Sequence, residues 1–415
     1  MMLWQLTLPS KQSRGVKMDV SLFINEMRDP AGVPFYPVVF QGLYVLTWAL
    51  HALFVYLAIG AMGVSIYGGL KQKGDAQWKQ ITSHLLMTGK IAVSVLIVLG
   101  VAPLLFSQTI YDAGWYVTNA LSGAWVFTFI YALVFGYMMY YWYQAANKKG
   151  ATSSTLIGVI SFVFLVFCGV LMHNFSYESI SPDKWMEWYA PDGVVDNSGW
   201  NFHVDTVRLL FMGAMTLPVV GVFMQVYAKF LSSRSDFSAE YLSFVAVVGK
   251  KIALIGFSVA TLLFMAWMYK AGYVVHPLTV GAVVLYILSA YVSIGDKNAY
   301  VTATLLVVAI LVVSAIRELI RYDIMSKVGY DLYGYPLNID WSSTVLFILT
   351  FGVLGLTGFA FILAMAWKVG KSEGVFDGQK DVLVSKLANY SLMLFSAWIV
   401  AFFGWGMITL FKNTL

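Results

Sequence analysis

The sequence predicts an all-α integral membrane protein, a helical bundle that crosses the bilayer about ten times. Of its 415 residues, 60% are hydrophobic and only 11% are charged, whereas an ordinary soluble domain has about 25% charged residues. The apolar residues gather in repeated runs of about 20, the length that spans the hydrocarbon core as a helix. Helices are expected because lipid cannot satisfy free backbone N–H and C=O groups.

The chain divides into an arm and one membrane domain. Residues 1–34 are mixed in polarity and predict an N-terminal arm or interfacial helix, with either Met1 or Met18 as the start. Residues 35–415 predict a single transmembrane domain. Its expected spans are 35–67, 84–110, 117–144, 156–173, 204–230, 251–270, 277–294, 301–320, 342–367 and 387–411.

Lysine and arginine indicate the orientation of these spans. They gather in alternate loops, at 71–79, 148–149, 229–251, 297 and 368–386. Cytoplasmic loops carry an excess of these residues, so we expect both termini to be extracytoplasmic. The other loops are poorer in lysine and arginine, although the basic residues of the arm, Lys11, Arg14 and Lys17, run against this pattern.

The longest polar interruption, residues 174–202, predicts an extracytoplasmic cap. Ser181 and Pro182 have the pattern of an N-cap followed by proline at the first helical position. Trp185, Trp188 and Tyr189 then fall on one face of a short helix. Aromatic residues of this kind favour the headgroup level of a bilayer, so we expect the cap to lie flat on the membrane surface.

Four of the five histidines are candidate cofactor residues. His51 lies near the middle of the first span, where an ionisable group is costly and indicates function. It could bind a haem iron or a quinone, or hydrogen-bond to a neighbouring helix. His173, His203 and His276 lie at outer ends of spans, where they could serve haem or quinone or simply reach water.

Haem iron is the metal that these residues would bind, with His51, His173 and His203 as the histidine ligands. Methionine is a further axial ligand of haem iron. Met212 and Met215 in the fifth span are the candidates, although a chain with 19 methionines uses most of them in packing.

A charged segment ends the eighth span. Glu318 and Arg321 are spaced i, i+3 and can pair, which leaves Arg317 in excess. Such a cluster could hold a haem propionate, a quinone oxygen or an acidic partner, or it could be a snorkelling anchor. Gln108, which follows the helix-kinking Pro103, offers a polar group near the same face. We therefore expect Arg317, Glu318, Arg321 and Gln108 to be catalytic in quinone chemistry.

Other features exclude several classes of site. One cysteine, Cys168, allows no internal disulfide, no cysteine-based zinc site and no covalent haem. The basic residues are spread over several loops, which does not indicate a nucleic-acid partner. No Asp or Glu lies deep in an expected span, so a carboxylate relay through the membrane is not expected.

Several short stretches together resemble membrane subunits related to subunit I of the cytochrome bd quinol oxidase superfamily. They are the residues around His51, VAPLLFSQTIYD at 101–112, MHNFSYESISPDKWMEWY at 172–189 and AIRELIRYD at 315–323. The closer resemblance is to a bacterial branch associated with c-type cytochromes. It implies a helical bundle in the bacterial cytoplasmic membrane, quinol chemistry at the outer face and b-type haem, with His51 matching a haem ligand of the first span.

The chain also departs from that family. Arg208-Leu209-Leu210-Phe211 stands where the family has a second histidine ligand, and the quinol-loop motif and intramembrane glutamates of the oxidases are absent. The resemblance therefore implies a relative that does not reduce oxygen. We expect a quinol/quinone oxidoreductase subunit, in contact with lipid, that exchanges electrons between quinone and a c-type cytochrome or other redox subunit. The alternatives are a transporter or channel, and a cofactor-free anchor of a redox complex.

Overall fold

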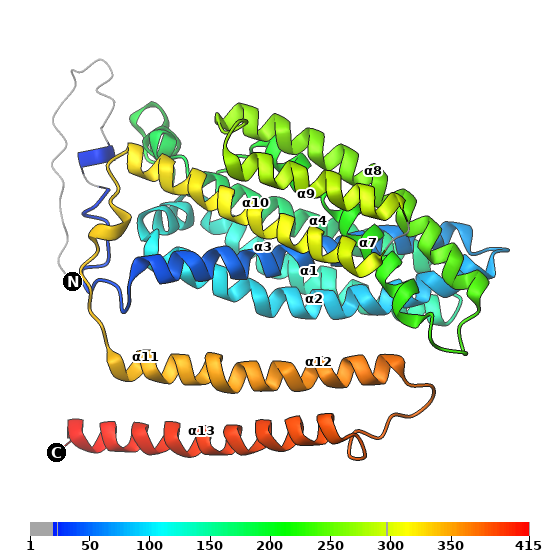
Figure 1. The fold of residues 1–415 in the computed structure, drawn as a ribbon. Helices are drawn as coiled ribbons and strands as arrows, with labels where there is room; N and C mark the ends of the chain where they lie inside the picture. Colours follow the sequence, from blue (N-terminus) through cyan, green and yellow to red (C-terminus); the bar gives the residue numbers. More distant parts are fainter. Residues whose placement is uncertain (1–19, 23, 296–297, 415) are drawn as a thin grey trace.

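A computed structural model describes residues 20–22, 24–295 and 298–414 (Figure 1). This part of the chain is helical, and its one strand-like feature is an isolated bridge between Val33 and Leu337. Ten spans are long and apolar enough to cross a membrane, which confirms the expected polytopic helical bundle. They are α1 (Pro37–Lys71), α2 (Ala76–Ile110), α3 (Asp112–Lys148), α4 (Ser154–Glu178), α6 with α7 (Thr206–Ala214 and Thr216–Leu231), α8 (Ala239–Ala271), α9 (Pro277–Ile294), α10 (Ala299–Lys327), α11 with α12 (Trp341–Ile348 and Leu356–Lys371) and α13 (Val382–Thr414).

Most helices run beyond the apolar segments that predict them. The second begins at Ala76 rather than at residue 84, because the Asp75 side chain caps it by accepting from the backbone N–H groups of Gln77 and Trp78. His84 therefore lies inside α2. The span Pro277–Ile294 has the predicted bounds. Hydropathy marks the part of a helix that meets lipid, whereas hydrogen bonding carries the helix into the interface.

Glycine lets the central helices approach closely. A Cβ at Gly221 of α7 would lie 2.4 Å from the backbone nitrogen of Ala253 on α8, and one at Gly249 would lie 2.7 Å from the Gly221 oxygen. Gly60 of α1 fits in the same way against the Thr216 carbonyl, where α6 ends and α7 begins. Without a hydrophobic drive between helices in lipid, such contacts supply much of the packing attraction.

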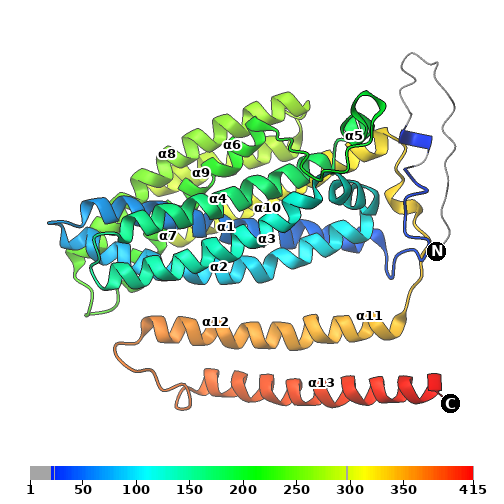
Figure 2. The ribbon, with the colours of Figure 1, turned by 180° about the vertical axis from the view of Figure 1, so that it is seen from behind.

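The last two spans form a hairpin that stands apart from the bundle. In Figures 1 and 2, α11, α12 and α13 lie in a separate layer beside α1 and α2. The apolar windows of both spans have no buried residue within the described structure. A π-helical turn, Leu349–Gly355, joins α11 to α12. Inside the hairpin, Trp398 donates to Thr350 Oγ1 at 2.6 Å.

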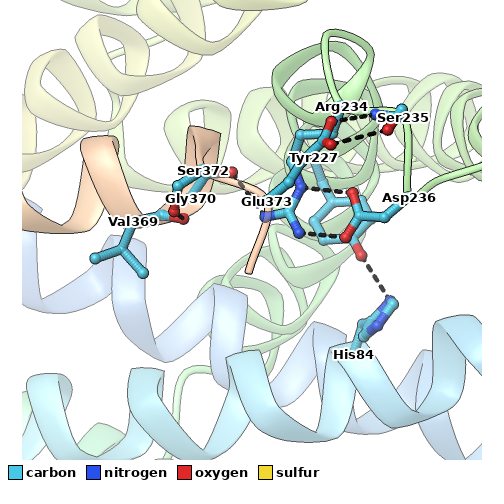
Figure 3. A network of polar contacts seen from close by, with 9 residues as sticks. All are labelled: His84, Tyr227, Arg234, Ser235, Asp236, Val369, Gly370, Ser372 and Glu373. Atoms are coloured by element: carbon cyan, nitrogen blue, oxygen red, sulfur yellow. Dashed lines mark hydrogen bonds and ion pairs between the residues drawn. The ribbon is translucent and has the colours of Figure 1, made fainter. Parts of the chain in front are cut away.

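Polar contacts attach the hairpin to the bundle at the end away from the cap (Figure 3). Arg234 pairs with Asp236 and donates to the Gly370 carbonyl at 3.1 Å. Glu373 accepts from the backbone N–H of Ser235 at 2.6 Å and from its hydroxyl at 2.8 Å. These interactions fix one end of the hairpin while its apolar length remains free to contact lipid.

The cap consists of residues 179–205, because α4 continues to Glu178. It contains η2 (Pro182–Lys184), α5 (Trp185–Tyr189) and η3 (Pro191–Gly193). Figure 2 shows α5 at the end of the bundle where α1 starts and α10 ends, called the cap end below. The expected helix forms, but only part of its aromatic face is exposed: Tyr189 is exposed, Trp188 stacks on His203, and Trp185 is 3% exposed and donates to the Glu178 carbonyl at 2.7 Å. The hydrogen bond from Trp185 to the Glu178 carbonyl and the packing of its indole against the protein outweigh the preference of the indole for the bilayer interface.

The described part of the arm, from residue 20 onward, folds against the α10–α11 loop. Residues 1–19, with Met1, Met18 and the three basic residues, lie outside the described part of the chain. Asp112 is the centre of this contact. It accepts from the backbone N–H groups of Asp29 and Ala113 and from the hydroxyls of Tyr330 and Tyr335, all within 3.2 Å.

Replacing Asp112 with asparagine is expected to destabilise the protein by about 1.5–3 kcal/mol, the range for hydrogen bonds to a charged group. The new amide would place a donor against one of these donors and remove the negative charge. Thermal unfolding in detergent measures the loss. The exposed cap residue Asp183 supplies the control, Asp183→Asn, and equal melting temperatures for the two variants would refute the role given to Asp112.

Candidate functional site

Three buried arginines form the most unusual feature of the cap end. Arg208, Arg317 and Arg321 are only 3%, 6% and 4% exposed. Among the described residues none of them lies within 4 Å of a carboxylate. A buried charge without an oppositely charged partner is costly. A snorkelling anchor would avoid this cost by reaching water, so the burial of these arginines argues against that role.

Aromatic rings and hydroxyls surround the guanidinium groups. Arg317 lies 4.5 Å from the ring centre of Trp48 and donates to the Tyr44 hydroxyl at 2.7 Å. Arg321 lies 4.8 Å from the Tyr44 ring and donates to Ser107 Oγ at 3.2 Å. Cation–π contacts compensate part of the desolvation. They do not satisfy Nε and Nη1 of Arg317, which are buried without a partner in the described structure.

Glu318 does not form the expected ion pair with Arg321. Its Oε1 instead accepts from the Tyr111 hydroxyl at 2.5 Å and from Gln41 Nε2 at 3.1 Å, because the side chain turns toward α1 and α2. Burial and the Glu318 carboxylate raise the pKa of Tyr111, so its hydroxyl remains a donor. Glu318 Oε2 is buried and has no partner in the described part of the chain. One acceptor atom is therefore available to a ligand.

A stripe on α1 links this carboxylate to His51. Gln41, Tyr44, Trp48 and His51 follow the spacing i, i+3, i+7 and i+10, which places them on one helix face. Gln41 touches Glu318, whereas Tyr44 and Trp48 touch Arg317. His51 lies about 15 Å along the helix from Gln41 by helix rise. The spacing of these residues is readable in the sequence, but only His51 stands out there as a functional candidate.

His51 has a defined tautomer. Its Nδ1 lies 2.9 Å from the Leu96 carbonyl oxygen on α2. A carbonyl only accepts, so Nδ1 carries the hydrogen and Nε2 keeps its lone pair. Histidines that bind a metal are commonly oriented in this way. Gly100 packs against the ring, where a Cβ would lie 2.8 Å from His51 Cε1.

The other predicted histidines have different surroundings, all at the cap end. His173 Nε2 accepts from the backbone N–H of Asp205 at 3.2 Å, and its Nδ1 is buried without a partner in the described structure. His276 caps α9 by accepting from the Leu278 N–H. His203 stacks on Trp188 at a centroid distance of 3.9 Å. The described residues contain no group of three His, Cys, Asp or Glu side chains suited to a metal ion.

The remaining candidates lie in less distinctive places. Met215 is buried where α6 meets α7, and its sulfur accepts from the Tyr286 hydroxyl at 3.4 Å. Met212 packs half-buried against the same core. Gln108 is half-buried on α2, beside the Ser107 that binds Arg321. The structure thus places Ser107, the neighbour of Gln108 in the sequence, against Arg321, whereas a role for Gln108 itself and haem ligation by the histidines and methionines stay predictions.

A cavity of about 280 Å³ lies between α4, α6, α8 and α10. Arg208, Arg317, Arg321 and Trp267 line it, together with Lys270 and Asp205, which pair at 3.1 Å. Burial would raise the pKa of Asp205, but hydrogen bonding to Arg208 N–H and Lys270 outweighs it and the pKa is lowered. Asp205 therefore remains ionised and bound to Lys270. The role of Arg208 in this cavity was not anticipated.

The acid sensitivity of the cap follows from His203. Burial first, and the positive charge of Lys184 second, lower the pKa of His203 below its usual 6.5. A histidine whose folded-state pKa is depressed contributes stability above about pH 6.5 that is lost as the pH falls toward the folded-state value. We expect tryptophan fluorescence to show the cap loosening over that range. His203→Phe keeps the stacking on Trp188 and should remove this pH dependence; an unchanged acid transition would contradict the assignment.

No family model, curated protein or solved structure matches the chain. Functional conclusions therefore depend on the residues and contacts described above.

Proposed function

We propose that the protein is the membrane subunit of a respiratory electron-transfer complex. In this role it exchanges electrons between quinol or quinone and an extracytoplasmic cytochrome, through b-type haem. The observation that carries the proposal is the α1 stripe, which joins a free, buried carboxylate oxygen of Glu318 to a histidine with a free Nε2. The resemblance to the cytochrome bd superfamily and the positive-inside pattern support an outward-facing cap end in a bacterial cytoplasmic membrane.

A quinol headgroup fits the chemistry of the Glu318 environment. Its hydroxyl would donate to Glu318 Oε2, the acceptor that protein leaves free. Arg317 and Arg321 would stabilise negative charge on the oxygen as its proton departs. Oxidation of a quinol releases two electrons and two protons, and Glu318 is placed to accept the first proton. Glu318, Glu178 and Asp112 are buried carboxylates near the cap end, so the protons would leave on that side.

His51 is the residue whose geometry fits a haem. His51 would be the residue that holds the iron, through Nε2, while the Leu96 carbonyl accepts from Nδ1 and fixes the ring. A bound haem would supply one-electron transfer between the two-electron quinol and a one-electron cytochrome partner. Trp48 and Tyr44 fill the helix face between His51 and the Glu318 environment, which excludes water from that region.

A transporter is the second candidate. Discontinuous spans occur in transporter binding sites, but the fifth span keeps helical dihedral angles at Met215, whose N–H donates to the Phe211 carbonyl at 3.1 Å, so α6 and α7 form one slightly irregular helix. If the protein were a cofactor-free anchor, we would expect neither electron transfer nor solute transport.

Proteoliposomes that contain the purified protein separate these functions. The proposal predicts quinol-dependent reduction of a soluble c-type cytochrome added outside, which requires the protein. Uptake of a solute without electron transfer would support the transporter. Absence of both activities in a protein that has incorporated haem would contradict the proposed electron transfer.

A further inference from the structure

We propose that the cavity between α4, α6, α8 and α10 binds the phosphate group of an anionic ligand, at a site that shares Arg317 and Arg321 with the proposed quinone chemistry but does not include Glu318. The source would be an anionic phospholipid headgroup or a small soluble phosphoester. Glu318, which is adjacent to Arg317 on α10, does not line this cavity.

The charges of the cavity lining call for an anion. Five cationic side chains line it, Lys184, Arg208, Lys270, Arg317 and Arg321, against the two carboxylates Asp183 and Asp205. The Asp205 carboxylate already pairs with Lys270 and accepts hydrogen bonds from the first backbone N–H groups of α6. The arginines therefore retain an excess of positive charge in a buried place, which a bound anion would neutralise.

Two of the lining arginines carry hydrogen-bond donors that no protein acceptor uses within the described structure. Arg317 has Nε and Nη1 without a partner in the described structure, and Arg208 has Nε. Arg208 Nη2 donates to Ser176 Oγ at 2.8 Å, which holds its guanidinium in place. Guanidinium groups bind phosphate through paired, charge-assisted hydrogen bonds. Two arginines from different helices, α6 and α10, can thus bind one phosphate.

Apolar walls accompany the charged lining. Trp267, Ile320 and Ile324 line the same cavity, and Trp267 lies 5.7 Å from the Arg208 guanidinium carbon. An amphiphile would place its phosphate on the arginines and its glycerol or acyl part along these side chains. A soluble phosphoester would use the arginines alone.

The test is thermal unfolding of detergent-purified, lipid-depleted protein with three probes. They are dioctanoyl phosphatidylglycerol, dioctanoyl phosphatidylcholine and inorganic phosphate at equal concentrations. We expect phosphatidylglycerol to raise the melting temperature more than phosphatidylcholine does. Phosphatidylglycerol acting alone would indicate a lipid headgroup, whereas equal stabilisation by inorganic phosphate would indicate a soluble ligand.

Arg208→Gln and Arg317→Gln should each weaken the stabilising ligand by about tenfold or more, the factor expected for one charge-assisted hydrogen bond. Both variants should retain the stability of the ligand-free protein, because they remove an uncompensated charge. Lys327→Gln is the control, since Lys327 is exposed at the same end. Lys270→Gln, at a largely exposed lining position, tests the site if the buried variants fail to fold.

Three results would overturn the site: no stabilisation by any probe, equal stabilisation by the zwitterionic lipid, or full stabilisation in the arginine and Lys270 variants. The two proposals share Arg317 and Arg321, so they are distinguished by residues that belong to one of them alone: Glu318→Gln should leave phosphate-dependent stabilisation intact, and Arg208→Gln should weaken phosphate binding while quinol oxidation continues. Failure of one proposal therefore does not imply failure of the other.

Discussion

Replacing Glu318 with glutamine is expected to lower quinol oxidation by roughly 10²-fold or more, the contribution typical of a positioned general base. The amide keeps the size of the side chain and can still accept from Tyr111 and Gln41. It cannot take up a proton, and its NH₂ group presents hydrogen where the free Oε2 now lies. Haem content and cap-end packing should be unchanged.

Turnover is measured as quinol-dependent cytochrome reduction in proteoliposomes. Glu26→Gln is the matched control, because Glu26 is an exposed glutamate at the same end of the bundle. Full turnover of Glu318→Gln at saturating quinol would show that Glu318 takes no part in quinol oxidation. The cavity lined by Arg208 would then be the next candidate site.

Replacing His51 with alanine is expected to abolish the b-type haem spectrum while the protein still inserts and folds. The variant removes the one nitrogen whose tautomer leaves a lone pair available in the α1 stripe. The lost hydrogen bond to Leu96 is a smaller effect, because one neutral bond contributes only about 1 kcal/mol.

His84→Ala supplies the control for this experiment. His84 also lies on a span and accepts or donates hydrogen bonds with Tyr227 and Tyr241, but at the end away from the cap. It should retain the haem signal. An unaltered spectrum in His51→Ala would assign the iron to another residue, with His173 and His203 as the next candidates.

Much of the fold was predictable from the sequence, because length and hydropathy determine how many helices can cross a membrane. The span Pro277–Ile294 was found with its bounds, whereas α2 was placed eight residues late because its first turns are polar. The isolated hairpin of α11, α12 and α13 was not predictable. Its side chains are as apolar as those of buried spans, and lipid and protein cover such residues equally well.

The candidate site was predictable in part. Arg317, Glu318 and Arg321 were recognised by their charge, but the partner of Glu318 was not, since Tyr111 and Gln41 are distant in the chain. From the sequence, Arg208 stands out only as part of the segment that replaces a histidine ligand of the family that the chain resembles. Its burial depends on how α6 packs against α4, which local spacing does not reveal. The helical period of the α1 stripe from Gln41 to His51 can be read from the sequence. It indicates a candidate site only when the fold places Glu318 and Arg317 beside it.

The most direct measurement is a dithionite-minus-air difference spectrum of the purified protein, with a pyridine haemochrome assay. The account predicts a b-type signal that quinol also reduces. No haem in an intact, folded sample expressed with an adequate haem supply would contradict the proposed electron-transfer function.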